Sequence, residues 1–279
     1  MLLDQGSHGC VYYPGIQCTH EKNMVSKVVN IKRATRELAI CDIIKKIPQY
    51  KRYFIPIETS CVVKSKKVKP CNVLSTAKTF MVMNMPFSKS LPEVFELDHY
   101  MELLHSIELL IQYKLVHFDI KNENIIFKPR PFLIDFGISL NMRDINVDEY
   151  FYFYQPSYFM WPIDVHLLGY INNVGVLDTS TLTRVCKDVY NKSPYLKNVD
   201  ECIKYYTYLV HYKKDEMIQE LLKGWNTWDL YSATVLLFKT IQVEALLPIF
   251  DCNPSKRLTP KASRLASRLA SSSESSCVS

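Results

Sequence analysis

The stretch LVHFDIKNENIIFKPRPFLIDFG, residues 115–137, places Asp119, Asn124 and Asp135 in a mostly apolar segment. A carboxylate that is buried without a partner costs several kcal/mol or takes up a proton. A protein core has no use for these polar groups unless each has a partner. We therefore interpret the stretch as part of a site where a ligand meets these side chains.

The composition is that of an ordinary globular protein. The chain has 279 residues, of which 48% are hydrophobic and 22% charged, which excludes a wholly disordered chain and allows one two-lobed domain or two small ones. Its formal net charge of +6 is spread along the sequence, so it suggests an acidic ligand but gives no indication of nucleic acid binding.

The nine cysteines include no Cys-x-x-Cys pair, so we predict reduced thiols and no zinc site. No segment approaches the roughly 18 apolar residues that cross a bilayer, and the N-terminus lacks the pattern of a signal peptide. We expect an intracellular, soluble, cytoplasmic protein without a membrane partner.

The hydrophobic pattern changes along the chain and predicts an α+β protein. Residues 1–86 are expected to form a small sheet, interrupted by one helix in RATRELAICDIIKKI (33–47). The expected strands lie in GCVYY (9–13), MVSKVV (24–29), YFIPI (53–57) and FMVMNM (80–85).

Residues 87–262 are expected to be mostly helical. Long apolar stripes mark residues 100–115 and 228–247, and residues 199–224 end on a helix-stopping glycine. The serine-rich residues 263–279, with their tandem ASRL repeat, are predicted to be a disordered tail.

The order Asp119, Lys121, Asn124 and Asp135 resembles the catalytic loop and Asp-Phe-Gly element of eukaryotic-type protein kinases. This resemblance implies a two-lobed kinase-like fold, with a β-rich N-lobe containing one key helix and a helical C-lobe, and it implies ATP and Mg²⁺ as ligands. Asp119 would take the proton of the acceptor hydroxyl, and Lys121 would offset the charge of the transferred phosphoryl group. Asn124 and Asp135 would hold magnesium. His117 is expected only to brace the loop.

Upstream, LDQGSHGCVYY (3–13) resembles the glycine-rich loop that covers the nucleotide. Gly6, Gly9 and Val11 match that pattern, while Asp4 replaces its first glycine and would bring a negative charge near the phosphates. The chain starts only a few residues before this loop, so we expect a shortened first strand, as if an N-terminal stretch were missing.

Lys27 in MVSKVV resembles the lysine that holds the α- and β-phosphates, with Lys32 as the runner-up. Glu37, on the polar side of the expected helix, would pair with Lys27. The segment FMVMNMPF (80–87) resembles the last strand of the small lobe and the hinge. There the backbone of Asn84, Met85 and Pro86 would bind adenine, and Met83 would close the rear of the pocket.

Further along, Asp229 resembles the buried anchor of the catalytic loop, and Arg257 resembles the arginine that ties down the end of the activation segment, here Asp164. Residues 165–225 would then be an insertion. The alternative is that Asp164 itself begins the central helix of the large lobe.

Phe118 stands where many kinases carry an arginine that binds a phosphate on the activation segment. We therefore predict activity that does not wait for phosphorylation of this segment; loss of all activity after phosphatase treatment would contradict the prediction. Lys121 is typical of the serine/threonine class, so the expected partners are protein substrates with Ser/Thr acceptors, and the chain itself through autophosphorylation. The compact plan resembles kinases of large DNA viruses, which would place the protein in a host cell or virion.

Two other functions remain open at this point. Small-molecule kinases of the aminoglycoside or choline type share the H-x-D-x-x-x-x-N loop, but commonly lack the equivalents of Phe136, Gly137 and Lys121. A non-catalytic kinase-like binding module is favoured by Asp4 and opposed by the full set of polar site residues, because an inactive scaffold has no chemical need for that set.

Overall fold

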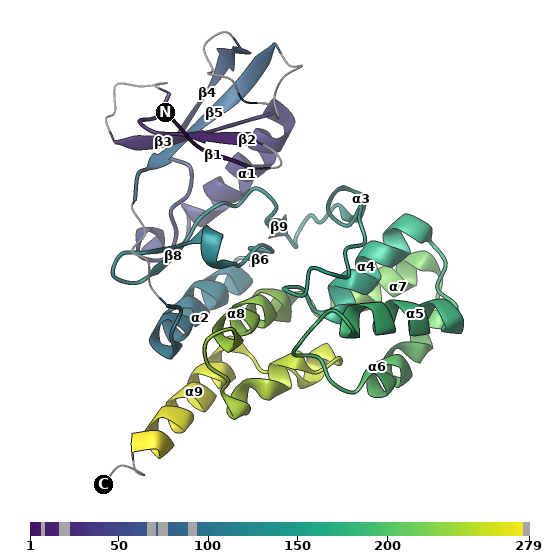
Figure 1. The fold of residues 1–279 in the computed structure, drawn as a ribbon. Coiled ribbons are helices and arrows are strands. Elements are labelled where there is room, and N and C mark those ends of the chain that lie inside the picture. Colours follow the sequence, from purple (N-terminus) through teal and green to yellow (C-terminus); the bar gives the residue numbers. More distant parts are fainter. Residues whose placement is uncertain (7–8, 17–22, 66–70, 72–77, 89–93, 276–279) are drawn as a thin grey trace. The chain divides into compact units, whose positions relative to one another are not determined.

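The computed structural model describes residues 1–6, 9–16, 23–65, 71, 78–88 and 94–275 (Figure 1). The chain divides into two compact units. Unit 1 comprises Met1–Pro92 and Asn124–Ser139, and unit 2 comprises Glu93–Glu123 and Leu140–Ser279. Helices and sheets are both present, which confirms the predicted α+β class. The division differs from the expected boundary at residue 86, because Asn124–Ser139 returns to the first unit.

Unit 1 is built on an antiparallel sheet with the strand order β1-β2-β3-β5-β4. Val11, Lys27 and Met83 are direct partners across three of its strands, so their side chains share one face. The opposite face carries a hydrophobic core that includes Tyr12 and Val82. The strands are β1 (Leu2–Gln5), β2 (Gly9–Tyr12), β3 (Met24–Val29), β4 (Thr59–Lys64) and β5 (Thr79–Pro86).

Helix α1 (Ile31–Ile44) is the single helix longer than one turn among the described residues of unit 1, and it contacts β5. Asn30 caps its N-terminus by accepting a hydrogen bond from the backbone N–H of Lys32. Its buried residues recur at helical spacing, and they include Glu37.

The expected strand at residues 53–57 is absent. Instead, Tyr53 and Ile55 exchange backbone hydrogen bonds with Leu133, and only one isolated bridge forms, at Phe54. Leu133 belongs to a hairpin of β7 (Ile125–Phe127) and β8 (Pro131–Leu133). These bonds attach the returning segment to the rest of unit 1.

The prediction that the thiols are reduced is wrong for three cysteines of unit 1, although Cys41 in the same unit is free. Cys10 on β2 forms a disulfide with Cys71, and Cys61 on β4 is also disulfide-bonded. Spacing along the sequence gives no sign of the first bond, because 61 residues separate its two cysteines.

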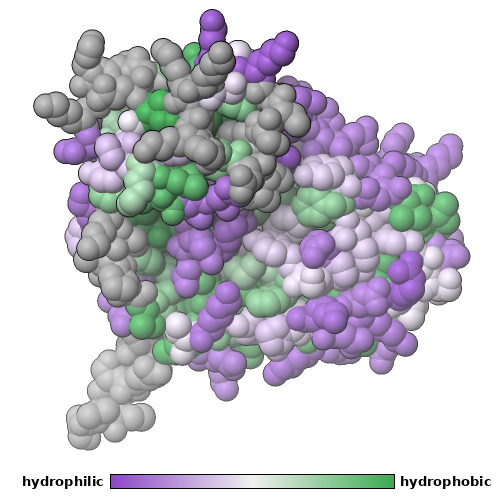
Figure 2. Space-filling view, turned by 45° about the horizontal axis from the view of Figure 1, so that its top comes forward, coloured by the Kyte–Doolittle hydropathy of each residue, from purple (hydrophilic) through white to green (hydrophobic). Residues whose placement is uncertain are grey.

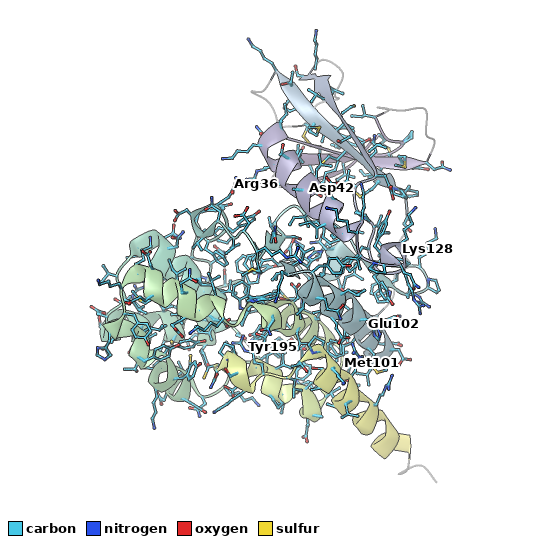
Figure 3. All side chains as sticks on the ribbon, turned by 180° about the vertical axis from the view of Figure 1, so that it is seen from behind. Arg36, Asp42, Met101, Glu102, Lys128 and Tyr195 are labelled. Carbon is cyan, nitrogen blue, oxygen red and sulfur yellow. A yellow bond between two sulfur atoms is a disulfide. The ribbon has the colours of Figure 1, made fainter. Side chains whose placement is uncertain are left out.

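Unit 2 is mostly helical. Helices α8 and α9 both contact α2, which carries Met101 and Glu102 (Figure 3), and every residue of α8 is buried. A two-stranded sheet of β6 (Leu115–Val116) and β9 (Leu140–Asn141) lies in the same unit. The helices are α2 (Leu97–Gln112), α3 (Val147–Tyr150), α4 (Ile163–Val174), α5 (Thr179–Tyr190), α6 (Val199–Tyr206), α7 (Lys214–Leu222), α8 (Trp228–Phe238) and α9 (Pro260–Ser275).

The expected insertion, residues 165–225, folds into most of α4 and all of α5, α6 and α7. The segment 199–224 is not one helix: α6 passes into a 3₁₀ turn at Thr207–His211. A new helix then starts after Lys213, whose backbone N–H donates to the Glu216 carboxylate.

The prediction of a disordered tail is wrong for the described residues up to 275. They form α9, where Ser263 and Ser267 are fully buried and Arg264 makes an ion pair of 2.6 Å with Glu108 of α2. Small side chains one turn apart allow the helix to pack closely, a feature that polarity alone does not reveal. Residues 276–279 lie outside the described part of the chain.

Figure 2 shows hydrophilic side chains over much of one face, with hydrophobic side chains in separate patches. In the described part of the chain, no helix is long and apolar enough to cross a membrane.

Candidate functional site

Three charged side chains meet in unit 1. The ammonium of Lys27 on β3 lies 2.8 Å from Glu37 Oε2 and 2.6 Å from Asp135 Oδ1. Glu37 comes from α1, the helix on which Figure 3 labels Arg36 and Asp42. The predicted Lys27–Glu37 pair is confirmed, but Glu37 is buried and not on the polar side of the helix.

The three groups differ in exposure, and this sets their electrostatics. The side chains of Lys27 and Glu37 are 15% and 3% exposed, whereas that of Asp135 is 42% exposed. Burial opposes the charge on Lys27, but the two carboxylates outweigh burial, so the pKa of Lys27 lies above its usual value. The lysine therefore stays charged, and the more exposed Asp135 can meet a ligand.

The backbone around Asp135 is built for close contacts. Gly137 donates its N–H to Asp135 Oδ1 at 3.2 Å. A Cβ at Gly137 would lie 3.1 to 3.2 Å from the charged atoms of Asp135, Glu37 and Lys27, so a larger residue would crowd the triad. Asp135 has a φ of 60°, an uncommon conformation outside glycine that occurs at functional sites.

Asn124 is buried and lies in unit 1, where its backbone is hydrogen-bonded to the segment that carries Asp135. Its carbonyl accepts a 3.0 Å hydrogen bond from the N–H of Ile134, the residue before Asp135. Within the described residues, no group of three or more His, Cys, Asp or Glu side chains is suited to a metal ion. One carboxylate and one amide oxygen fit Mg²⁺, which usually takes one or two carboxylates and completes its shell with phosphates and water.

A second cluster lies in unit 2 around Asp119. Lys121 Nζ is 2.7 Å from Asp119 Oδ2, and the Tyr158 hydroxyl donates to Asp119 Oδ1 at 2.8 Å. His117 is fully buried, and its Nδ1 accepts the N–H of Asp119 at 3.3 Å, which agrees with the bracing role predicted for it. The sequence did not indicate Tyr158, because it is one of several tyrosines in its segment and follows no recognisable motif.

Asp229 on α8 anchors the loop that carries Asp119. Its carboxylate accepts the backbone N–H groups of His117 at 2.6 Å and Phe118 at 2.9 Å. Burial raises the pKa of Asp229, while His117 and the two N–H groups act in the opposite direction. The predicted anchor is therefore confirmed, and Phe118 is held at a φ of 68°.

The alternative role for Asp164, at the start of a central helix that anchors the loop, is excluded by its contacts. Asp164 lies on α4 and forms a buried ion pair of 2.7 Å with Arg257, as predicted for the end of the activation segment. Its second oxygen accepts the indole N–H of Trp228. The loop anchor and the arginine partner are thus two different aspartates.

Phe118 is buried in an aromatic cluster. Its ring stacks on Trp161 with centroids 4.7 Å apart, and meets Phe151 and Trp228 at 5.6 and 5.8 Å. The indole N–H of Trp161 also donates to the Phe118 carbonyl at 2.8 Å. Residues 151 and 161 are therefore bound to the loop by ring packing and one hydrogen bond.

The other site residues predicted in the first part of the chain lie in unit 1 and are only partly brought together. Gly9 packs against β3, where a Cβ would lie 2.5 Å from the Val28 carbonyl oxygen, so only glycine fits. Gly6 is exposed and donates its N–H to the Gly9 carbonyl, and the loop tip between them lies outside the described residues. Asp4 is exposed on β1. Lys32 is exposed on α1 and has no place in the triad.

The predicted hinge residues lie inside strand β5. The Asn84 side chain is buried and hydrogen-bonded to Ser26 and Thr59. The backbone carbonyl of Asn84 accepts the N–H of Glu58 at 2.8 Å. Asn84 is thus occupied by the sheet and is not a free hinge group. Met85 pairs with Val25, which places it on the same face as Lys27 and Met83.

Comparison of the chain with protein-family models and with curated proteins gives no match.

Proposed function

We propose that the chain is an ATP-dependent protein kinase of the serine/threonine class with a two-lobed kinase-like fold. The observation that carries the proposal is Lys27, which is bound at once to Glu37 of α1 and to Asp135. Phosphoryl transfer needs a fixed cation for the phosphates and a carboxylate for magnesium, and this triad provides both.

The nucleotide half of the proposal rests on unit 1. Val11, Lys27 and Met83 share a sheet face with Met85, which supplies apolar surface beside the cation. Asn124 and Asp135 would hold Mg²⁺, which when bound would neutralise phosphate charge. Gly9 keeps the β2 backbone close to β3.

The acceptor half rests on unit 2. Asp119 would orient the acceptor hydroxyl and take its proton, and Lys121, 2.7 Å from the carboxylate, would offset charge on the transferred group. Because Lys121 is typical of the serine/threonine class, the proposed partners are proteins with Ser or Thr acceptors.

The two other candidate functions explain fewer contacts. A small-molecule kinase has no need for Gly137 beside the triad or for Lys121 on Asp119. A non-catalytic module has no chemical need for the charged groups of both units. Neither alternative is favoured by a separate observation.

The test is transfer of labelled γ-phosphate from ATP to casein, followed by phosphoamino-acid analysis. We expect label on serine or threonine, and a rate lower by about 100-fold or more in Asp119→Asn and Lys27→Met. Lys32→Met is the matched control, because this lysine is exposed on α1 and should leave the rate unchanged.

A thermal-shift series with magnesium and ATP, together and separately, separates binding from transfer. A folded wild type that binds magnesium-ATP but labels no protein would contradict kinase activity on proteins and favour the binding module or a small-molecule acceptor. Equal rates in wild type and Lys27→Met would contradict the role of the triad.

The aromatic cluster around Phe118 supports activity without a phosphorylated activation segment. The arginine of other kinases uses a phosphate to order this segment, whereas here Phe118 is stacked on Trp161. We expect phosphatase-treated protein to keep its activity on casein.

A further inference from the structure

The carboxylate of Asp119 already binds a hydroxyl group of the same chain. Tyr158 donates its hydroxyl to Asp119 Oδ1 at 2.8 Å, within the reach required between a general base and the proton that it abstracts. We propose that Tyr158 is a phosphoryl acceptor, modified within its own chain. The inference rests on the proposed function, because it assigns to Asp119 the role of orienting the acceptor. It adds one tyrosine acceptor within the chain to the Ser and Thr acceptors proposed for other proteins, because Tyr158 is already held on Asp119.

The ring of Tyr158 is held in place by Trp161, which is bound to the loop that carries Asp119. It meets Trp161 edge to face with centroids 4.7 Å apart. Trp161 in turn stacks on Phe118 and donates its indole N–H to the Phe118 carbonyl. Tyr158 is therefore fixed at both ends, by its hydroxyl on Asp119 and by its ring on Trp161, which itself packs on Phe118.

The charges around the hydroxyl fit this role. Burial and the nearby Asp119 carboxylate raise the pKa of Tyr158, so its oxygen keeps its proton until a base removes it. Lys121 binds the other carboxylate oxygen at 2.7 Å, which places a cation beside the acceptor.

The step balances with ATP as the donor. A bond forms between the Tyr158 hydroxyl oxygen and the γ-phosphorus, while the bond from that phosphorus to the β,γ-bridging oxygen breaks. The hydroxyl proton passes to Asp119 Oδ1, and ADP leaves with the electron pair of the broken bond.

The experiment is site mapping by tandem mass spectrometry after phosphatase treatment, removal of the phosphatase and incubation with magnesium-ATP. We expect phosphate on Tyr158 in the wild type and in Tyr152→Phe, and none at position 158 in Tyr158→Phe. Tyr152 is the matched control because it lies in the same segment but is 54% exposed.

Transfer within one chain is separated from transfer between chains by adding a tagged Lys27→Met protein as acceptor. We expect a first-order rate that is independent of protein concentration, with no phosphate on the tagged chain. Phosphate on Tyr158 of the tagged chain would overturn the inference, as would an unmodified Tyr158 in a preparation that labels casein. A protein that labels neither casein nor itself contradicts the proposed function and this inference together.

A measurement without nucleotide tests the hydroxyl contact alone. With 3-fluorotyrosine at position 158, the fluorine resonance should differ between the wild type and Asp119→Asn, because the variant lacks the carboxylate charge. Identical resonances would overturn the inference, whatever the outcome for casein.

Discussion

The imidazole of His166 on α4 is buried, and its Nε2 has no hydrogen-bond partner. Burial lowers its pKa to about 4, from an ordinary value of 6.5, against the effect of two backbone hydrogen bonds. The folded protein thus binds a proton at His166 less readily than the unfolded chain does. The contribution of neutral His166 to the free energy of unfolding is therefore complete above pH 6.5 and is lost as the pH falls towards 4.

We expect His166→Gln to flatten the decrease in the free energy of unfolding between pH 7 and 4.5. A shift of this size corresponds to about 3 kcal/mol at most. Urea denaturation at several pH values measures the slope, and His211→Gln, at an exposed position, is the control. The same slope in His166→Gln and the wild type would contradict the prediction.

The sequence motifs predicted which polar residues pair with each other, but not how deeply those residues are buried. The Lys27–Glu37 pair and the Asp229 anchor follow from the order of motifs along the chain, because each motif fixes one type of residue at one place. The role of Asn84 in the sheet was not predictable, because it depends on strand register. The burial of Glu37 was not predictable, because it depends on how α1 packs in unit 1. The contact between Tyr158 and Asp119 was not predictable either, because it depends on how the chain folds between the two residues.

At the scale of elements, α9 packs through small side chains. Ser263 is fully buried and donates its hydroxyl to the Thr259 carbonyl, and α9 contacts α2. We expect Ser263→Leu to lower the free energy of unfolding by about 1–3 kcal/mol, because the larger side chain must push the helices apart. Lys261→Leu adds the same side chain at an exposed position of the helix and should cost little.

Chemical denaturation of both variants checks this prediction. Equal stability of Ser263→Leu and Lys261→Leu would show that α9 is not tightly packed on α2. The helix itself was missed because a serine-rich repeat lacks the apolar stripe by which amphipathic helices are recognised. Helix α2 carries such a stripe and was predicted to within a few residues. Helix α8 is buried on every side, and its apolar sequence predicted its start but not its end at Phe238.

At the scale of the whole molecule, the two units differ in their cysteine chemistry. In unit 1, Cys10 and Cys71 form a disulfide, Cys61 is also disulfide-bonded and Cys41 is free, whereas the described cysteines of unit 2, Cys186, Cys202 and Cys252, are all free. A disulfide stabilises the folded state mainly by restricting the unfolded chain, and one that closes a long loop is typically worth about 2–4 kcal/mol.

We expect a reductant, or the double change Cys10→Ala with Cys71→Ala, to lower the stability of unit 1 and leave unit 2 unchanged. Hydrogen exchange followed by mass spectrometry reports on peptides of each unit in the same sample. Peptides of β2 and β3 should lose protection, while those of α8 should not. Equal loss in both units would contradict the assignment of the disulfide to one of them.

Unit 1 is formed by two separate pieces of the amino-acid sequence. Its second piece, Asn124–Ser139, supplies Asp135 to Lys27 and packs Phe136 against Phe54. A gene fragment that stops at residue 92 would therefore encode a sheet whose Lys27–Glu37 pair lacks the second carboxylate and whose Phe54 ring lacks its partner Phe136. Separate expression of this unit requires both pieces joined by a linker, so the borders for cloning cannot be chosen by cutting the sequence once.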